Sequence, residues 1–243
     1  MTERIDDLQC NGYRIIQEEK GFCFGMDAVL LANFAVPFVN KETKFLDLGT
    51  GTGIIPLLIA AKTEAENIAG IELQAEVAGM AERSVRLNHA EERIRIIAGD
   101  IREIRSMGMG SSVNVVTANP PYMKTGLQST ENRKLISRHE VTGTFRDFAE
   151  AAAFVLKSNG RFFLVHRPNR LPEIMAELGR VHLEPKRLRM VYPYLGSEAN
   201  LFLLEAVKGG KSQLTVEKPL IVYQEQNQYT QEIYEIYGMN DTV

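Results

Sequence analysis

The sequence predicts an α/β fold with a doubly wound, mostly parallel β-sheet that closes with an antiparallel hairpin. Short apolar runs alternate with helical patterns between residues 44 and 179, an order that is typical of consecutive β-α-β units. A glycine-rich turn at residues 49–53 joins the first of these strands to its helix. Two strand-like segments, 182–192 and 201–207, then follow each other without a helix between them. We therefore expect these two segments to pair antiparallel at one edge of the sheet.

The first forty residues contain two short elements and one helix. Residues 12–24 read as two extended pieces around a turn at residues 19–21. Residues 26–39 are strongly apolar and predict a helix, which Pro37 ends or kinks. Asp27 stands at the start of this helix, where an aspartate serves either as the N-cap or as part of a ligand site.

From residue 44 onward the apolar and amphipathic patterns predict the elements of the sheet and its covering helices. The segment 74–89 is amphipathic, because five apolar residues recur on one face at helical spacing. The segment 145–157 is followed by Ser158-Asn159-Gly160, which is a typical helix end. The expected strands are 44–48, 67–73, 93–98, 113–118 and 161–166, and the expected helices are 54–62, 74–89, 145–157 and 171–179.

Composition limits the class of protein. A chain of 243 residues suits one compact domain, divided here into an N-terminal segment 1–40, a core 41–208 and a C-terminal extension 209–243. The net charge of −3 gives no global argument for nucleic acid. We expect no signal peptide and no membrane span, because the N-terminus lacks a basic stretch followed by an apolar core and no apolar run is long enough to cross a bilayer. We expect no metal, because Cys10 and Cys23 lack the spacing of metal ligands. The sequence thus predicts a cytoplasmic monomer with free thiols.

The glycine-rich turn reads Gly49-Thr50-Gly51-Thr52-Gly53, and Asp47 precedes its first glycine by two positions. Glycines let backbone N–H groups approach a ligand at the N-terminus of the following helix. A dinucleotide fingerprint has the pattern G-x-G-x-x-G, whereas the third glycine here comes one residue early. A carboxylate fits poorly beside a pyrophosphate but suits an ammonium group. The turn therefore favours S-adenosylmethionine over NAD as the cofactor.

Two more acidic residues, Glu72 and Asp100, lie at the ends of the next two expected strands. An acid about 20 residues beyond a glycine turn is suited to accept hydrogen bonds from ribose hydroxyls, which favours this role for Glu72. Asp100 lies in Gly99-Asp100-Ile101, where it is placed to read an adenine amino group. A single strand-end acid is most often a helix N-cap, but three on successive strands behind a glycine turn favour a cofactor site.

The tetrapeptide Asn119-Pro120-Pro121-Tyr122 follows the expected strand 113–118. Two prolines cannot continue a strand, and the residue before a proline is extended, so the chain leaves the sheet abruptly there. Ligands bind at the carboxyl ends of strands in open α/β sheets. The tetrapeptide is thus either a ligand clamp or a rigid turn with a packed tyrosine, and the upstream motifs favour the clamp.

A long polar segment, residues 123–142, comes next. Segments of this length without predicted structure are often functional in compact domains. It contains His139-Glu140, a pair that suits either acid–base chemistry or a purely structural role. The sequence leaves both roles open.

These motifs together resemble the class I S-adenosylmethionine-dependent methyltransferases, which have a seven-stranded Rossmann-like fold and methylate exocyclic or amide nitrogens. Residues 45–53 with Glu72, Asp100 and Asn119–Tyr122 carry this resemblance. Other segments are similar to the bacterial tRNA(Val) adenine-N6 methyltransferase-like family, so that the resemblance covers roughly residues 10–235. These segments are Phe24–Ala32, Ser137–Glu140, Glu205–Lys211 and Pro219–Tyr223.

The resemblance implies a role for individual residues. The side chain of Asn119 and the carbonyl of Pro120 would accept the two N–H groups of the target nitrogen, and Tyr122 would stack on the planar target. Glu72 would bind the ribose, and Asp100 with the backbone of Ile101 would bind the adenine of the cofactor. The remaining cofactor-binding residues would be Asp27, Asp47, Gly49, Gly51, Gly53 and Asn119.

The family also implies the substrate, an adenine N6 in tRNA near the anticodon, as in tRNA(Val), or in other structured RNA. Residues 157–189 contain eight Lys or Arg against three Glu, which suits a phosphate-contacting edge if the side chains share a face. Charge runs are otherwise ordinary solvated surface. The expected substrate-binding residues are Tyr122, Arg138, His139, Lys186 and Arg187.

Two other functions stay open at this point. A protein-glutamine N5-methyltransferase acting on release factors would use the same tetrapeptide, since an amide presents the same two N–H donors. Relatives of that class carry a sizeable helical domain before the cofactor strand, whereas few residues precede it here. The third reading is a non-catalytic cofactor- or RNA-binding module. The polar, tyrosine-rich tail at 224–237 is either a docking helix or a poorly ordered end.

Overall fold

The computed structural model describes residues 2–18, 25–122, 143–226 and 228–239. The strands are β1 (Glu3–Asp7), β2 (Arg14–Glu18), β3 (Lys44–Leu48), β4 (Asn67–Glu72), β5 (Ile94–Ala98), β6 (Val113–Ala118), β7 (Leu156–His166), β8 (Leu183–Tyr194), β9 (Leu201–Lys208), β10 (Thr215–Val216), β11 (Leu220–Glu225) and β12 (Gln228–Tyr229). The α-helices are α1 (Met26–Ala35), α2 (Ile54–Lys62), α3 (Ala75–Leu87), α5 (Phe145–Val155), α6 (Leu171–Arg180) and α7 (Gln231–Tyr237). Three 3-10 helices are η1 (Val36–Phe38), η2 (Ile101–Met107) and η3 (Pro168–Arg170).

One large sheet organises the molecule. In the part of the chain that the structure describes it has ten strands, in the order β12-β11-β8-β9-β7-β6-β3-β4-β5, with β10 beside β8. Five neighbouring strands, from β5 through β4, β3 and β6 to β7, run parallel. Strand β9 lies between β7 and β8 and is antiparallel to both. The predicted α/β fold with a mostly parallel sheet and an antiparallel hairpin is confirmed, although β11 pairs with the outer side of β8, so the hairpin is not at the edge.

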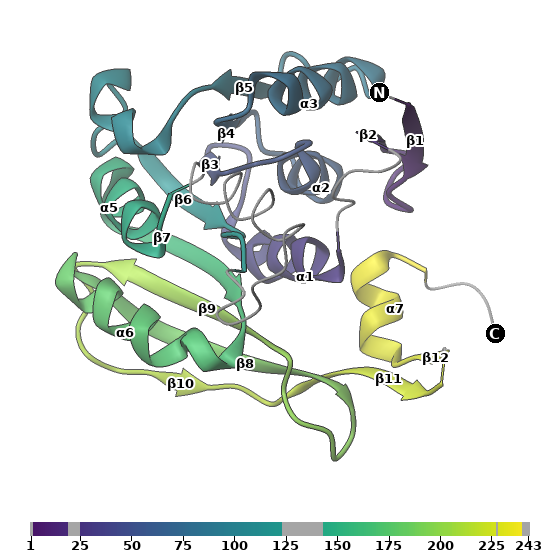
Figure 1. Cartoon of the computed structure of the whole chain (residues 1–243), viewed down its shortest axis with the longest axis vertical. Helices are drawn as coiled ribbons and strands as arrows, with labels where there is room; N and C mark the ends of the chain where they lie inside the picture. The colour runs from purple at the N-terminus through teal and green to yellow at the C-terminus, as the bar shows by residue number, and fades with distance from the viewer. Residues whose placement is uncertain (1, 19–24, 123–142, 227, 240–243) are drawn as a thin grey trace, which may run out of the picture.

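Helices cover both faces of this sheet, as Figure 1 shows. One core contains buried residues of α1, α2 and α7, and the other contains buried residues of α5, α6 and η2. Helix α2 buries almost all of its residues, because it packs between the sheet and α1. Helix α3 is amphipathic as predicted, and it buries Ala78, Met80, Ala81, Ser84 and Val85. Covered strands of this kind leave only their ends available for a ligand.

The strands nearest the glycine turn follow the prediction closely. Strands β3 and β6 and helix α2 have the expected limits, and β4 and β5 differ from expectation by one residue. The predicted end of the helix 145–157 was wrong, because α5 stops at Val155 and β7 starts at once. Leu156 is fully buried and pairs with Val113, so sheet pairing overrides the local helix-end signal.

The N-terminal segment differs from the predicted pair of extended pieces. Strand β2 pairs antiparallel with β1, which the sequence analysis did not expect, and the predicted turn at 19–21 lies outside the described residues. The predicted helix 26–39 ends as α1 at Ala35, and a 3-10 turn around Pro37 follows. Cys10 is a free thiol, whereas Cys23 lies outside the described residues.

The C-terminal extension is part of the same architecture. Strand β11 extends the sheet beyond β8, and α7 packs against α1 through the buried Ile233 and Ile236. Residues 231–237 of the tail thus form a docked helix. The division into segments 1–40, 41–208 and 209–243 stays a prediction.

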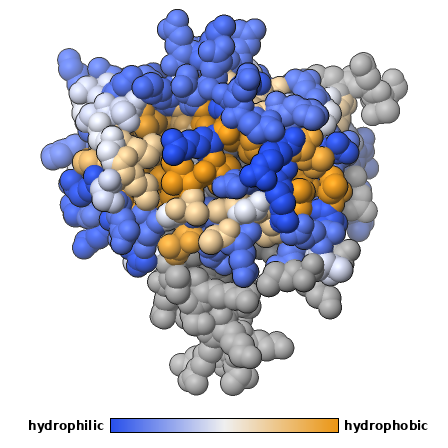
Figure 2. All heavy atoms as spheres, turned by 90° about the horizontal axis from the view of Figure 1, so that it is seen from above, coloured by the Kyte–Doolittle hydropathy of each residue, from blue (hydrophilic) through white to orange (hydrophobic). Residues whose placement is uncertain are grey.

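Figure 2, seen from the side of α3 and β5, shows hydrophobic residues at the surface between hydrophilic ones.

Candidate active site

The candidate site lies where the parallel strands end. Strands β5, β4, β3, β6 and β7 lie side by side with the same direction, so the residues that follow them meet at one edge of the sheet. The glycine turn follows β3, Glu72 ends β4, and Asp100 comes two residues after β5. Asn119 follows β6 directly, and His166 ends β7. The sheet thus brings the predicted acids and the tetrapeptide to the same edge.

At three positions of the glycine turn, the backbone has a conformation that only glycine adopts readily. Gly49, Gly51 and Gly53 have φ angles of 70°, 57° and 87°. A Cβ atom at Gly49 would lie 3.2 Å from the ring of Phe148, whereas one at Gly51 would meet no atom within 4 Å. Gly51 therefore borders open space at the N-terminus of α2, where backbone N–H groups and the helix dipole favour a polar ligand.

Glu72 is anchored to this turn by its own side chain. Its Oε2 accepts a hydrogen bond from the backbone N–H of Gly51 at 3.0 Å, and its Oε1 accepts one from Gln74 at 2.9 Å. The residue is 6% exposed. Two backbone donors fix the carboxylate and leave further lone pairs for hydroxyl donors.

Asp47 is more deeply buried, with 1% exposure. Its Oδ1 accepts a hydrogen bond from the hydroxyl of Thr117 at 2.6 Å, but its Oδ2 is buried without a partner among the described residues. Burial raises the pKa of Asp47 to about 7, against the opposing effects of the Thr117 hydrogen bond and of the nearby Thr50 hydroxyl. An unpartnered buried oxygen is costly, so this carboxylate is suited to a donor supplied by a ligand.

Asp100 has a structural partner of its own. It is the N-cap of η2 and accepts from the backbone N–H of Arg102 at 2.9 Å, and the guanidinium of Arg102 also contacts its carboxylate. Hydrogen bonding to the Arg102 side chain holds the pKa of Asp100 below its ordinary value. The capping role that the sequence left open is therefore present, and the buried Ile101 follows it.

The tetrapeptide meets a residue that is distant in the sequence. Asn119 donates from Nδ2 to Oδ2 of Asp27 at 3.1 Å, and the hydroxyl of Tyr122 lies 2.8 Å from the same oxygen. The hydroxyl is also 3.1 Å from Oδ1 of Asn119. Burial and the nearby Asp27 raise the pKa of Tyr122, so its hydroxyl stays protonated. Asp27 is not the N-cap of α1, because Gly25 takes that position.

Two further residues, His166 and Arg167, contact Tyr122 and were not predicted as site residues. The ring of His166 makes an edge contact with the ring of Tyr122 at 5.1 Å between centroids. The guanidinium of Arg167 lies over the Tyr122 ring, also at 5.1 Å. Burial and the charge of Arg170 lower the pKa of His166 to about 4, so the imidazole is neutral near pH 7. Its position at the end of the strand next to β6 was the signal that would have identified it.

Several cations of the predicted basic run 157–189 have partners within the protein. Arg187 contacts Glu205 and Glu217, and it also lies over the rings of Phe34 and Phe38. The ammonium group of Lys186 donates to the carbonyl of Lys211. The structure thus shows protein partners for both residues, and their role in binding substrate stays a prediction.

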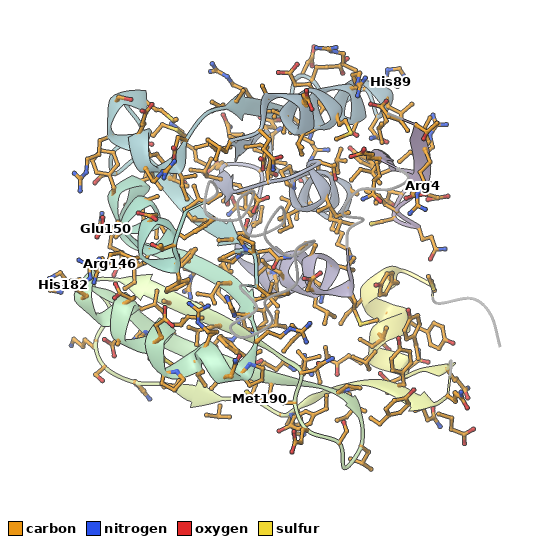
Figure 3. The ribbon with its side chains drawn as sticks, in the orientation of Figure 1. Arg4, His89, Arg146, Glu150, His182 and Met190 are labelled. Atoms are coloured by element: carbon orange, nitrogen blue, oxygen red, sulfur yellow. The ribbon has the colours of Figure 1, made fainter. Side chains whose placement is uncertain are left out.

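Arg180, which also belongs to this run, shares an acidic partner with Arg146, a residue that precedes the run. Arg146 pairs with Glu177, and Arg180 pairs with both Glu177 and Glu150. Figure 3 shows Arg146 and Glu150 next to each other on the outer side of α5. The predicted substrate residues Arg138 and His139 lie outside the described residues.

Comparison with known proteins assigns the family. A family model described as methyltransferase small domain matches residues 25–182, about two thirds of the chain. The chain belongs to this methyltransferase family. The match begins just before Asp27 and includes the glycine turn, both strand-end acids and the Asn119 tetrapeptide. The predicted likeness to methyltransferases, and to the tRNA(Val) group among them, is confirmed.

Several curated relatives of this methyltransferase are named tRNA1(Val) (adenine(37)-N6)-methyltransferase. The protein of Tolumonas auensis is 29% identical over 225 residues, which cover 90% of each chain. The protein of Bacteroides thetaiotaomicron is 25% identical over 213 residues, or 87% of each chain. The protein of Histophilus somni is 29% identical over 154 residues, which span 63% of this chain and 64% of the relative, somewhat less than two thirds.

Solved structures agree on the architecture. A protein of Agrobacterium tumefaciens, described as a predicted O-methyltransferase, superposes with a TM-score of 0.72 at 25% identity and covers 90% of this chain and 98% of its own. The TYW2 protein of Pyrococcus horikoshii, solved with MeSAdo, has a TM-score of 0.61 at 14% identity and covers 86% of this chain and 72% of its own. The Rossmann-like methyltransferase fold is thereby confirmed.

The described residues lack two further kinds of feature. They contain no group of three or more His, Cys, Asp or Glu side chains arranged to hold a metal ion. None of the helices in the described ranges is both long and apolar enough to cross a bilayer.

Proposed function

We propose that this methyltransferase transfers a methyl group from S-adenosylmethionine to the exocyclic N6 of an adenine in tRNA. The observation that carries the proposal is the grouping at the end of β6. There a carboxamide, a proline carbonyl and an aromatic ring stand beside the glycine turn and its acids. The curated relatives named as tRNA adenine-N6 methyltransferases support the choice of acceptor.

The residues around the glycine turn fit the cofactor. The partnerless Oδ2 of Asp47 suits the ammonium of the methionine end, and the open space at Gly51 lets the chain approach it closely. Glu72 is held in place for the ribose hydroxyls, and Asp100 with Ile101 borders the adenine side. When bound, S-adenosylmethionine supplies an electrophilic methyl group on a positively charged sulfur.

The tetrapeptide Asn119–Tyr122 forms the acceptor clamp, which binds the two N–H groups of the acceptor nitrogen. An exocyclic amino nitrogen shares its lone pair with the ring, which makes it a weak nucleophile. Hydrogen bonds to Oδ1 of Asn119 and to the carbonyl of Pro120 favour a pyramidal nitrogen, whose lone pair can then point at the methyl group. The Tyr122 ring holds the base flat by stacking, as expected for a base turned out of its stack. As the nitrogen gains the methyl group it gives up one of the two protons that face Asn119 and Pro120, and this proton passes to solvent. The residues of the site therefore act mainly by positioning.

The proposed acceptor places the protein with tRNA in the cytoplasm. A glutamine side chain presents the same two N–H groups, so the clamp alone does not separate an adenine from a protein amide. The curated relatives that are named as tRNA adenine-N6 methyltransferases favour adenine.

The direct test is transfer of labelled methyl groups from S-adenosylmethionine to unmodified tRNA. We expect nuclease digestion of the product to yield labelled N6-methyladenosine. Total RNA and total protein from a strain that lacks this chain are assayed in parallel. Label in a release factor and none in RNA would refute the adenine assignment.

Asn119→Ala tests the division of roles within the site. We expect methyl transfer to fall at least about 100-fold, because one preorganised acceptor at the reacting nitrogen is lost. The affinity for S-adenosylmethionine, measured by calorimetry, should stay nearly unchanged. Asn67→Ala is the matched control, since Asn67 is exposed at the start of β4 away from this edge. Loss of cofactor binding in Asn119→Ala would contradict the assignment.

A further inference from the structure

We propose that Asp27 is a positioning residue of the acceptor clamp, which sets the orientation of the Asn119 carboxamide. This inference rests on the proposed function, because it concerns the atom that would receive the substrate N–H group. It also assigns Asp27 to the acceptor side of the site, whereas the family resemblance implies a contact with the methionine end of the cofactor.

The burial of Asp27 is the first observation. It lies in the first turn of α1, where an acidic side chain ordinarily points to solvent and interacts with the helix dipole. Asp27 is instead only 8% exposed. Gly25 occupies the N-cap position and Asp27 lies two residues further on, so Asp27 is not the N-cap residue. A buried carboxylate requires partners, and those partners indicate its role.

Both oxygens of Asp27 have partners. Oδ1 accepts from the backbone N–H of Ala28 at 2.9 Å, and Oδ2 accepts from Asn119 and Tyr122 at 3.1 and 2.8 Å. The last two contacts join residues that are 92 and 95 positions apart in the sequence. The carboxylate therefore links α1 to both polar side chains of the clamp.

The chemistry of these contacts selects one orientation of Asn119. A carboxylate only accepts hydrogen bonds, so it binds the NH₂ side of the carboxamide and repels the oxygen side. Oδ1 of Asn119 is consequently directed away from Asp27 and stays an acceptor. The flipped carboxamide would present NH₂ to an amino substrate, and two donors would then face each other. Asp27 thus decides whether Asn119 offers an acceptor or a donor.

The surroundings hold Asp27 in this arrangement. A Cβ atom at position 25 would lie 2.6 Å from Oδ1 of Asp27, so any side chain there would force the carboxylate out of this position. The Tyr122 hydroxyl lies 2.8 Å from Oδ2 and 3.1 Å from Oδ1 of Asn119. One carboxylate thereby fixes the carboxamide and the ring together.

The test is Asp27→Asn, which keeps the size of the side chain but adds a donor. An asparagine at this position can donate to Oδ1 of Asn119, so the carboxamide is no longer held in one orientation. We expect kcat to fall about 100-fold, while KM for S-adenosylmethionine and its dissociation constant change less than about threefold. If Asp27 instead holds the methionine end of the cofactor, the dissociation constant rises at least about tenfold and the proposal is overturned.

A double-mutant cycle separates positioning from a purely structural role. If Asp27 acts through Asn119, the variant with both Asp27→Asn and Asn119→Ala should be no slower than Asn119→Ala alone. Losses that multiply would overturn the proposal. Glu76→Gln is the matched control, because Glu76 is an exposed first-turn acid of α3, and it should leave kcat unchanged.

The outcome does not depend on the identity of the acceptor. The variants are assayed with whichever substrate the unaltered protein labels, RNA or protein. Label in a protein amide would refute the adenine assignment and leave the Asp27 test intact, because an amide nitrogen presents the same donors. An additive cycle with labelled tRNA would refute the role of Asp27 alone.

Discussion

Asp47 is the residue in which burial and charge conflict most directly. It is 1% exposed, and one of its oxygens has no partner among the described residues. Burial raises its pKa to about 7, which makes the carboxyl group about half protonated near neutral pH. A positively charged ligand group beside it would favour the ionised form and lower this pKa again. Binding of the cofactor and ionisation of Asp47 are therefore linked.

We expect S-adenosylmethionine binding to release a proton below about pH 7, because the bound cation lowers the pKa of Asp47. Affinity should rise with pH and level off above that value. Calorimetry at about pH 6 in buffers of different ionisation enthalpy measures the proton directly. Asp47→Asn is the control and should remove the release. Equal proton release in both proteins would contradict the linkage.

The raised pKa of Asp47 also makes the free energy of unfolding depend on pH. The folded pKa of Asp47 lies above the ordinary value of 3.8, so its contribution is fully present below about pH 4 and is lost as pH rises through about 7. The pKa of His166 is lowered to about 4, so its contribution is present above 6.5 and is lost as pH falls through about 4. We expect Asp47→Asn to increase the gain in stability between about pH 4 and 6.5, as measured by urea unfolding. An unchanged profile would show that Asp47 ionises normally.

Tyr122 combines a stacking surface with a hydroxyl, and substitution separates the two. Tyr122→Phe keeps the ring but loses the contact with Asp27, so we expect a fall in kcat with little change in KM for tRNA. Tyr122→Ala also loses base stacking, which is worth about 1–3 kcal/mol, so KM should rise at least about fivefold. Steady-state kinetics with tRNA test both. A higher KM for Tyr122→Phe alone would argue against a stacking role.

The elements of the fold were predictable where a local pattern coincided with the packing. Strand β6 is apolar and stops at two prolines, and α2 follows a glycine turn, so both had clear local limits. Strand β1 has the sequence ERIDD, in which no buried face is visible, and it forms only because β2 pairs with it. Its existence depends on a partner and not on its own sequence.

The candidate site was predictable to a similar degree. The strand-end acids and the tetrapeptide were found because the topology of a parallel sheet places strand ends together. The hydrogen bond between Asn119 and Asp27 could not be predicted, because it joins residues far apart in the sequence. A carboxylate at the start of a helix usually serves as its N-cap. The charge of Arg187 was visible, but its pairing with Glu205 and Glu217 was not.

Helix α7 attaches the C-terminal extension to the helix that carries Asp27. Ile233 of α7 is fully buried. The carbonyl of Ile236 also accepts a hydrogen bond from the ammonium of Lys62, the last residue of α2, at 2.5 Å. We expect Ile233→Ala to lower the free energy of unfolding by about 2–5 kcal/mol, because it leaves a cavity against α1. Urea denaturation measures this. The exposed neighbour Glu235→Ala should change it by less than about 0.5 kcal/mol. Equal effects would mean that α7 does not contribute to the core.

The whole molecule has a net charge of −3, yet its proposed substrate is a polyanion. Most arginines in the described ranges form ion pairs with acids of the protein, which leaves them less available for phosphates. Arg167 is exposed, and its guanidinium lies over the ring of Tyr122.

The segment 123–142 follows the clamp directly and contains Lys124, Arg133, Lys134 and Arg138. We expect the combined change of these four residues to glutamine to weaken tRNA binding and to reduce its salt dependence. Each lost phosphate contact lowers the slope of log K against log salt by about 0.9 at most, and by about 0.7 where the RNA is single-stranded. Filter binding over a range of salt concentrations measures the slope.

The matched control is the pair Arg146→Gln and Arg180→Gln, since both arginines are tied to acids on α5 and α6. These changes should leave the slope of log K against log salt equal to that of the unaltered protein within experimental error. The charges that they remove are already neutralised by Glu150 and Glu177. The cofactor affinity of the control pair should also be unchanged, because Arg146 and Arg180 pair with acids of α5 and α6 and not with the glycine turn. If the control pair reduces the slope and the segment does not, RNA approaches over α5 and α6, and the clamp would receive its base from that side.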